Sequence, residues 1–303
     1  MDCAKSVGYL NADNDCSGCA SRNFRPNNSV PCSVTVCTSA IRILEIFSIM
    51  DAHWICIVSL LYVMNAIAQD TPPKNQATSE PATQEYITNK LNTYRREVGG
   101  SNMQLLTWDP EVQAIAQKFA DKCSPTFPTN DALRRAYLST PKYKCGANVG
   151  RGTELIDWGD ILQMWYNTSV NFEYGSTTEK EGVSSGFYTA MIWAKSFGVG
   201  CGFNKCEING KKNGLFVCNF CPAGNLVTSK SEPYEKGEPC GKCPNACDEG
   251  LCTNPCPYTN QYGNCDKLFP KKCAVTVKEV PQLKDVVSKC PATCKCRDNG
   301  LLY

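Results

Sequence analysis

Histidine is almost absent from this chain, which has one, His53, among 303 residues. Any site that needs two or more imidazoles, such as a multi-histidine zinc centre, is therefore excluded. An excess of one charge is also missing: the net charge at pH 7 is only +2, so no global basic field points to nucleic acid as a partner. Hydrophobic residues make up 42% of the chain, which is typical of a globular protein.

Long runs without a charged residue are scarce, and the clearest spans residues 52–68. It ends in Ala66-Ile67-Ala68, a small-x-small pattern typical of signal cleavage, so we predict a signal peptide over 50–68 and a secreted mature chain that starts at Gln69. Removal of this segment would remove His53, and a mature chain without histidine has no histidine base and no Ser–His or Cys–His pair. The alternative is a signal anchor that starts near Ile41, although charged residues interrupt that longer stretch.

Residues 1–49 precede this signal, whereas a signal peptide belongs at a chain start. We interpret them as an N-terminal extension, with translation starting at Met50. Cys16, Cys19, Cys32 and Cys37 in this extension have the composition of a four-cysteine metal site. Because the extension has little apolar periodicity and no histidine, we favour the interpretation that it is not native sequence.

Cysteine is abundant, with 22 residues, which favours an oxidising compartment. Sixteen of them follow Gln69, an even number that allows eight disulfides with no thiol left over. Six are spread over residues 123–221, and ten crowd into residues 240–296. The dense part is too short for an ordinary apolar core, so we predict that cross-links hold it together.

Local patterns predict mainly helices first and a β-hairpin late, which indicates an α+β fold. A Pro-, Thr- and Ser-rich segment, 69–83, is predicted to be flexible. Helical periodicity follows over 87–98, after the N-cap pair Asp109-Pro110, and around 161–165. The β-like runs 199–203 and 215–220 flank Asn209-Gly210 and Asn213-Gly214, two pairs that favour a hairpin turn.

Four motifs carry a family resemblance. Gly186-Phe-Tyr-Thr-Ala-Met-Ile-Trp193 with Gly198-Val-Gly-Cys-Gly202 resembles the first signature of the CAP (SCP) superfamily, and Leu215–Asn225 resembles its second. Cys240–Cys256 is similar to the hinge of the vertebrate cysteine-rich secretory proteins. Cys290-Pro-Ala-Thr-Cys-Lys-Cys296 is similar to their C-terminal module, which is related to sea-anemone potassium-channel toxins.

The resemblance implies an α-β-α sandwich over 84–231, a small disulfide-rich hinge over 232–255, a helical cysteine-rich module over 256–296 and a tail over 297–303. It also implies the disulfide pairing, which the sequence alone would leave open. The implied pairs are Cys123–Cys206, Cys145–Cys221, Cys201–Cys218, Cys240–Cys247, Cys243–Cys252, Cys256–Cys296, Cys265–Cys290 and Cys273–Cys294.

The family places two histidines and two acids in a cleft of the sandwich, where they can bind a divalent metal. The matching positions here are Phe127, Ala147, Thr168 and Phe187, which are poor or impossible zinc ligands. We therefore expect no metal, no cofactor and no catalytic residue, and the two phenylalanines predict an apolar cleft.

Two surface signals remain. Asn167-Thr168-Ser169 is an N-glycosylation acceptor sequence beside the expected cleft. From Cys265 onward there are eight basic and four acidic residues, a net charge of +4 that suits an anionic channel mouth or membrane surface, although a plain solvated surface has the same composition.

Three functions follow from these observations. The first is a non-enzymatic, monomeric secreted protein that binds a cell-surface target, such as an ion channel or a gamete surface. The second is a lipid or sterol carrier that uses the apolar cleft. The third, a hydrolase, is disfavoured by the missing histidines.

Overall fold

The structure is a computed structural model, and it divides the chain into two units, Met1–Tyr62 and Val63–Tyr303. It describes residues 54, 57–61, 71–124, 126–153, 155–176, 184–208, 210–226, 229–258, 260–262, 264–297 and 300–301. Of the first unit, Trp54 and the helical residues 57–61 are described, whereas the expected metal-site cysteines and the expected cleavage site lie outside the described residues. No helix in the described part of the chain is both long and apolar enough to cross a membrane.

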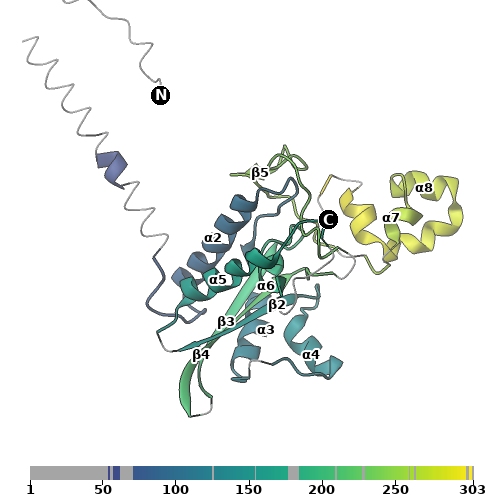
Figure 1. The fold of residues 1–303 in the computed structure, drawn as a ribbon. Helices are drawn as coiled ribbons and strands as arrows, with labels where there is room; N and C mark the ends of the chain where they lie inside the picture. Colours follow the sequence, from purple (N-terminus) through teal and green to yellow (C-terminus); the bar gives the residue numbers. More distant parts are fainter. Residues whose placement is uncertain are drawn as a thin grey trace, which may run out of the picture. The chain divides into compact units, whose positions relative to one another are not determined.

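A four-stranded sheet forms the centre of the second unit, with the strand order β1-β3-β4-β2 (Figure 1). Strand β3 pairs in antiparallel fashion with β4, which pairs likewise with β2, while the short β1 runs parallel to β3. The bounds are β1 Thr107–Trp108, β2 Gly146–Thr153, β3 Gly198–Ile208 and β4 Lys211–Cys221.

The expected hairpin is present, with its turn at Gly210, whose φ of +71° suits glycine. The second expected turn pair, Asn213-Gly214, was wrong as a turn signal, because both residues lie inside β4. Gly214 is needed there for a different reason: a Cβ would lie 2.7 Å from the ring of Phe216.

Helices α3 (Pro110–Ala120) and α4 (Asp131–Leu138) lie on one face of the sheet. Helix α3 starts as expected, because Asp109 Oδ1 accepts hydrogen bonds from the backbone N–H groups of Glu111 and Val112. The helix lies directly on β3, where a Cβ at Gly200 would come within 2.1 Å of the Gln113 nitrogen. The glycines of the first signature therefore permit this close approach of helix and strand.

The other face carries α2 (Pro81–Val98), α5 (Trp158–Tyr166) and α6 (Gly186–Met191), which enclose the main apolar core. Of the segment 69–83, which the sequence predicts to be flexible, residues 71–83 are described, and α2 already begins at Pro81. In addition, the backbone and indole N–H groups of Trp158 donate to oxygens of Gln76, both at 2.9 Å. Helices on both faces of one sheet make this part an α-β-α sandwich.

The hinge contains a two-stranded sheet, β5 (Cys247–Asp248) with β6 (Leu251–Cys252). The C-terminal module is built from short helices around Phe269, which is fully buried. These helices are α7 Cys265–Leu268, α8 Cys273–Glu279, η3 Pro281–Lys289 and η4 Ala292–Cys296, and a further short helix in the sandwich is η2 Asn167–Asn171.

All sixteen cysteines after Gln69 form disulfides, in the eight pairs that the resemblance implied. Three bonds lie in the sandwich, two in the hinge and three in the C-terminal module. Cys201 and Cys218 are direct partners across β3 and β4, so this bond adds a covalent link to an existing strand pair.

Candidate functional site

A cavity of about 270 Å³ opens at the edge of β2, next to α6. The sequence brings these elements together because Asn148 of β2 donates from its amide to the Phe187 carbonyl of α6, at 2.9 Å. The described side chains that line the cavity are small, apolar or neutral: Ala147, Asn148, Ser184, Phe187, Ala190, Phe220 and Asn225. Since no described lining residue is ionisable, the cavity offers neither a proton donor nor an anionic metal ligand at neutral pH.

Two of the four positions expected at the metal cleft, Ala147 and Phe187, line this cavity. The ring of Phe187 is 39% exposed and stacks on the buried Trp165, with a centroid separation of 6.3 Å. A methyl group and a phenyl ring stand where a metal site would need oxygen or nitrogen ligands, so these residues do not fit a zinc ion.

Thr168 is not among the residues that line the cavity, but it is hydrogen-bonded to Tyr188, the residue after Phe187. The Thr168 hydroxyl donates to the Trp165 carbonyl at 2.8 Å and accepts from the Tyr188 N–H at 3.1 Å. Both hydrogen bonds tie η2 to its neighbours α5 and α6. The hydroxyl is therefore committed to backbone groups.

Phe127 does not line the cavity. Its ring stacks on Phe119 of α3 with centroids 4.0 Å apart, in an apolar cluster with Tyr137, Leu215 and Val217. The structure thus brings together Ala147 and Phe187, holds Thr168 close by through Tyr188, and places Phe127 in the packing beneath α3.

Two tyrosines of α5 and α6, Tyr166 and Tyr188, stay neutral at pH 7. Burial raises the pKa of Tyr188, and the neighbouring Tyr166 adds to the rise. Burial and a hydrogen bond from the Tyr166 hydroxyl to Glu97 Oε2, at 3.0 Å, raise the pKa of Tyr166 to about 12. Neither phenol can therefore act as a general base near neutral pH.

Asn167, the expected glycan acceptor, is exposed at the junction of α5 and η2. Its side-chain oxygen accepts a hydrogen bond from Gln163 at 2.8 Å. A glycan at Asn167 would stand next to Thr168, and so beside the cavity rather than within it.

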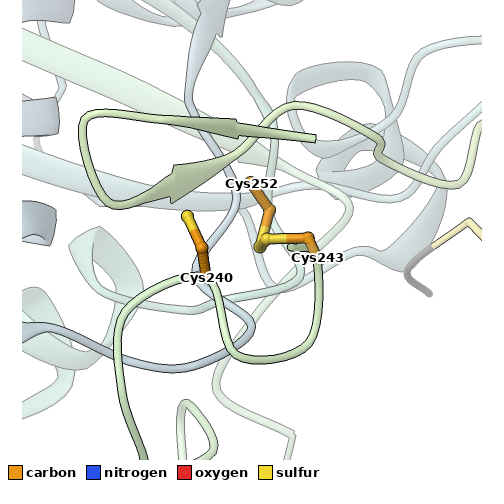
Figure 2. Close-up of side chains that lie close together, drawn as sticks. All are labelled: Cys240, Cys243 and Cys252. Atoms are coloured by element: carbon orange, nitrogen blue, oxygen red, sulfur yellow. A yellow bond between two sulfur atoms is a disulfide. The ribbon is translucent and has the colours of Figure 1, made fainter. Parts of the chain in front are cut away.

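A second cluster of potential ligands lies in the hinge. The sulfur atoms of Cys240, Cys243 and Cys252 all lie within 4.8 Å of one another. Figure 2 shows the side chains of Cys243 and Cys252 meeting each other, with the side chain of Cys240 beside them and its sulfur turned toward a hinge strand. Cys243 is bonded to Cys252, and Cys240 is bonded to Cys247. Because both disulfides are formed, no thiolate is free, and the oxidised cluster therefore does not fit a metal ion.

Comparison with known proteins decides the family. Residues 88–220 match the model of the cysteine-rich secretory protein family (CAP), and residues 240–300 match the Crisp model. Cysteine-rich secretory protein 2 of Cavia porcellus is 35% identical over 223 residues, which are 73% of this chain and 86% of that protein. The chain belongs to the cysteine-rich secretory protein family.

Solved structures are similar to this family member at lower identity. One is NaASP2 with Zn²⁺, at 24% identity, a TM-score of 0.47, and coverage of 60% of this chain and all of that one. Another is the Schistosoma mansoni venom allergen-like protein 4, at 22% identity, a TM-score of 0.41, and coverage of 53% of this chain and 97% of that one.

The C-terminal module of this cysteine-rich secretory protein presents its lysines to solvent. Lys267, Lys272, Lys278, Lys284 and Lys289 are all exposed, and they are spread over α7, α8 and η3. Lys271 is paired with Glu279 at 2.7 Å. The module can therefore meet an anionic surface with several positive charges at once.

Sequence reasoning missed one residue that organises the sandwich of this family member, Arg95 of α2. It is fully buried, and its guanidinium donates five hydrogen bonds to backbone carbonyls at 2.9–3.2 Å, those of Gln104, Met191, Trp193, Ala194 and Ser196. Burial lowers the pKa of Arg95 to about 9, so it remains charged at neutral pH. No sequence signal marks it, because an arginine in a helix is usually solvated.

Proposed function

We propose that this cysteine-rich secretory protein is secreted, has no catalytic activity, and acts as a rigid ligand for a cell-surface target, such as an ion channel or a gamete surface. The observation that carries the proposal is the cavity beside Ala147 and Phe187, which has no ionisable group among its described lining residues. A scaffold that keeps its eight cross-links but has no acid, base or metal ligand in its cleft is suited to binding rather than to catalysis.

The C-terminal module supports a cell-surface target. Its exposed lysines are held on a disulfide-linked frame, so they present a fixed pattern of positive charge to an anionic partner. Preorganised charge speeds the encounter with an oppositely charged surface and loses little entropy on binding.

Cell-surface capture by the secreted full-length protein tests this proposal. We expect the charge-reversed variant Lys267→Glu with Lys284→Glu to lose binding by roughly tenfold, because two attractive charges become repulsive. The matched control reverses two exposed lysines of the sandwich, Lys142→Glu with Lys211→Glu, and should retain binding. Equal loss in both variants would show that overall charge, and not the module, governs binding.

Zinc binding tests the non-enzymatic part of the proposal separately. Calorimetry on the tag-free mature protein should show no saturable zinc binding, and zinc should not raise its melting temperature. Tight one-to-one binding would contradict the proposed loss of the metal site. The variant Ala147→Glu with Phe187→His places two ligands at the cavity and should gain weak binding.

Carriage of a lipid or sterol is a second candidate, favoured by the rings of Phe187 and Phe220 at the cavity. The volume of about 270 Å³ is below the range of roughly 300–1,000 Å³ that encloses drug-sized ligands. The cavity can therefore enclose only part of a sterol. A thermal shift with cholesterol or with a fatty acid would separate carriage from surface binding.

A further inference from the structure

One hinge disulfide, Cys240–Cys247, differs from the other seven in its access to solvent. Of the sixteen disulfide-bonded cysteines in the described part of the chain, Cys247 alone is exposed. Its partner Cys240 is only 5% exposed, and the neighbouring Cys243 and Cys252 are 3% and 0% exposed. Among these sixteen cysteines, Cys247 is therefore the one that an external thiolate can reach most easily.

The buried side of the same bond lies next to a second disulfide. The sulfur of Cys240 is within 4.8 Å of both sulfur atoms of the Cys243–Cys252 bond (Figure 2). Thiol–disulfide exchange requires a thiolate to approach a disulfide sulfur, so after its own bond breaks the Cys240 side chain must rotate to bring its sulfur from this separation to bonding distance. Cys240 and Cys243 are also separated by just two residues, Gly241 and Lys242, so a bond between them would close a short loop.

We propose that the hinge is a thiol–disulfide exchange site, with Cys247 as the point of attack and an extracellular thiol as the substrate. In the first step the external thiolate bonds to Cys247 Sγ, the Cys240–Cys247 bond breaks, and Cys240 leaves as a thiolate. In the second step Cys240 attacks the neighbouring disulfide, forms a bond with Cys243 or Cys252, and releases the other as a thiolate. One external thiol is consumed, one protein thiol is released, and the number of disulfides is unchanged.

The exchange alters the cross-links of Cys252, and the backbone of this residue attaches the hinge to the sandwich. Its backbone N–H donates to the Met103 carbonyl at 2.7 Å, and its carbonyl accepts from the Leu105 N–H at 2.8 Å. Exchange removes the cross-link between Cys243 and Cys252 while these backbone bonds remain. An external thiol would thus loosen the loop 240–247 without cutting the hinge from the sandwich.

Trapping experiments on the full mature protein test this proposal. The folded protein is exposed briefly to 2-mercaptoethanol, quenched with N-ethylmaleimide and mapped by mass spectrometry. We expect Cys247 to carry the mercaptoethanol group, the maleimide to lie on Cys243 or Cys252, and Cys240 to be bonded to the other of these two. Maleimide on Cys240 with Cys243–Cys252 intact would overturn the exchange step, and first attack at any other disulfide would overturn the site.

Two variants sharpen the result. In Cys243→Ala with Cys252→Ala the first attack remains possible, so the maleimide should move to Cys240. In Cys240→Ala with Cys247→Ala the exposed sulfur is gone, and labelling should slow by tenfold or more. An unchanged labelling rate in this second variant would overturn the assignment of Cys247. Circular dichroism establishes that each variant is folded, and the mapping of the unmodified protein is decisive by itself.

Discussion

The sandwich and the C-terminal module solve the same stability problem in different ways. Nearly all of the largest fully buried side chains belong to the sandwich, among them Trp158, Trp165 and Phe216, and one belongs to the module, Phe269. Each part nevertheless has three disulfides. The sandwich buries enough apolar surface for its cross-links to be accessory, whereas in the module they replace a core that so short a chain cannot build.

The hinge belongs with the sandwich in this comparison. Leu251 is fully buried in the main core of the sandwich. Ser101 donates its backbone N–H to the Glu235 carbonyl at 2.8 Å, and Lys242 donates to the Ser101 carbonyl at 3.0 Å. By packing and hydrogen bonds the sandwich therefore extends to about Cys252, past the expected boundary at 231.

The largest loss of stability is expected when Arg95 is replaced, since its side chain joins α2 to the loop after α6. The substitution Arg95→Met keeps the apolar stem but removes the guanidinium donors of five buried carbonyls, of which Trp193 and Ala194 keep a backbone N–H donor. We expect the free energy of unfolding of the sandwich to fall by about 3–5 kcal/mol. Chemical denaturation, monitored by tryptophan fluorescence, measures this free energy.

Arg96 provides the matched control for that substitution. It follows Arg95 in the same helix but pairs at the surface with Glu249, at 3.1 Å. Arg96→Met should cost less than about 1 kcal/mol. Similar losses in the two variants would contradict the organising role assigned to Arg95.

Removal of one disulfide should affect the stability of the module and that of the sandwich very differently. In Cys265→Ala with Cys290→Ala we expect a loss of about 2–5 kcal/mol, which unfolds the module because Phe269 and its neighbours cannot hold it alone. The sandwich should keep its melting transition. Proteolysis and calorimetry measure both parts, and a single transition that loses both together would contradict the two-unit comparison.

The equivalent change in the sandwich, Cys201→Ala with Cys218→Ala, is the control. These residues face each other across β3 and β4, in a strand pair that runs for eleven registered positions. The strand pairing should hold the fold together after the bond is lost, although at reduced stability. Collapse of the sandwich in this variant would show that its cross-links are not accessory.

Local signals in the sequence predicted the elements of the sandwich where a cap and an apolar period coincide, as at Asp109 and α3. They failed where a tertiary contact decides the matter. Asn213-Gly214 has the composition of a turn, yet the glycine is needed because the ring of Phe216 fills the space of a side chain. Likewise, no local signal predicts that Gln76, just before α2, accepts a hydrogen bond from Trp158, which lies far away in the sequence.

The candidate site was predictable in composition but not in placement. Counting histidines was enough to predict a cleft without imidazole ligands. The family resemblance identified Phe127 as a cleft position but could not tell that its ring packs on Phe119 instead of lining the cavity. Arg95 escaped prediction because its partners are backbone carbonyls, which have no sequence signature.

Removal of one contact between the hinge and the sandwich should lower the free energy of unfolding moderately. The Asn102 side chain exchanges two hydrogen bonds with Glu235, accepting from its N–H at 2.9 Å and donating to its carboxylate at 3.3 Å. Asn102→Ala should cost about 1 kcal/mol. Hydrogen exchange should rise in residues 232–252 and stay unchanged in the module. If protection there is unchanged, the hinge does not depend on this contact for its attachment to the sandwich.

The smallest expected effect is a dependence of the sandwich's stability on pH, which arises from the contact between Tyr166 and Glu97. Burial and the Glu97 carboxylate raise the pKa of Tyr166 from 10.0 to about 12, so between these values the folded phenol keeps a proton that the unfolded phenol has lost. A rise in pH through this range therefore favours the unfolded state. The stability that the Tyr166 phenol contributes is complete below pH 10 and is lost as the pH rises toward 12.

The substitution Glu97→Gln removes the negative charge, which should lower the pKa of Tyr166 and make the free energy of unfolding less dependent on pH in this range. Arg95 acts in the opposite sense above pH 9 but is present in both proteins, so its contribution cancels. Glu97 also raises the pKa of Tyr188, so the difference between the two proteins reports both phenols, and tyrosinate absorbance follows them together. Tyrosinate absorbance and denaturation at several pH values measure the two quantities. Identical alkaline profiles for both proteins would show that the Tyr166–Glu97 contact does not couple to folding.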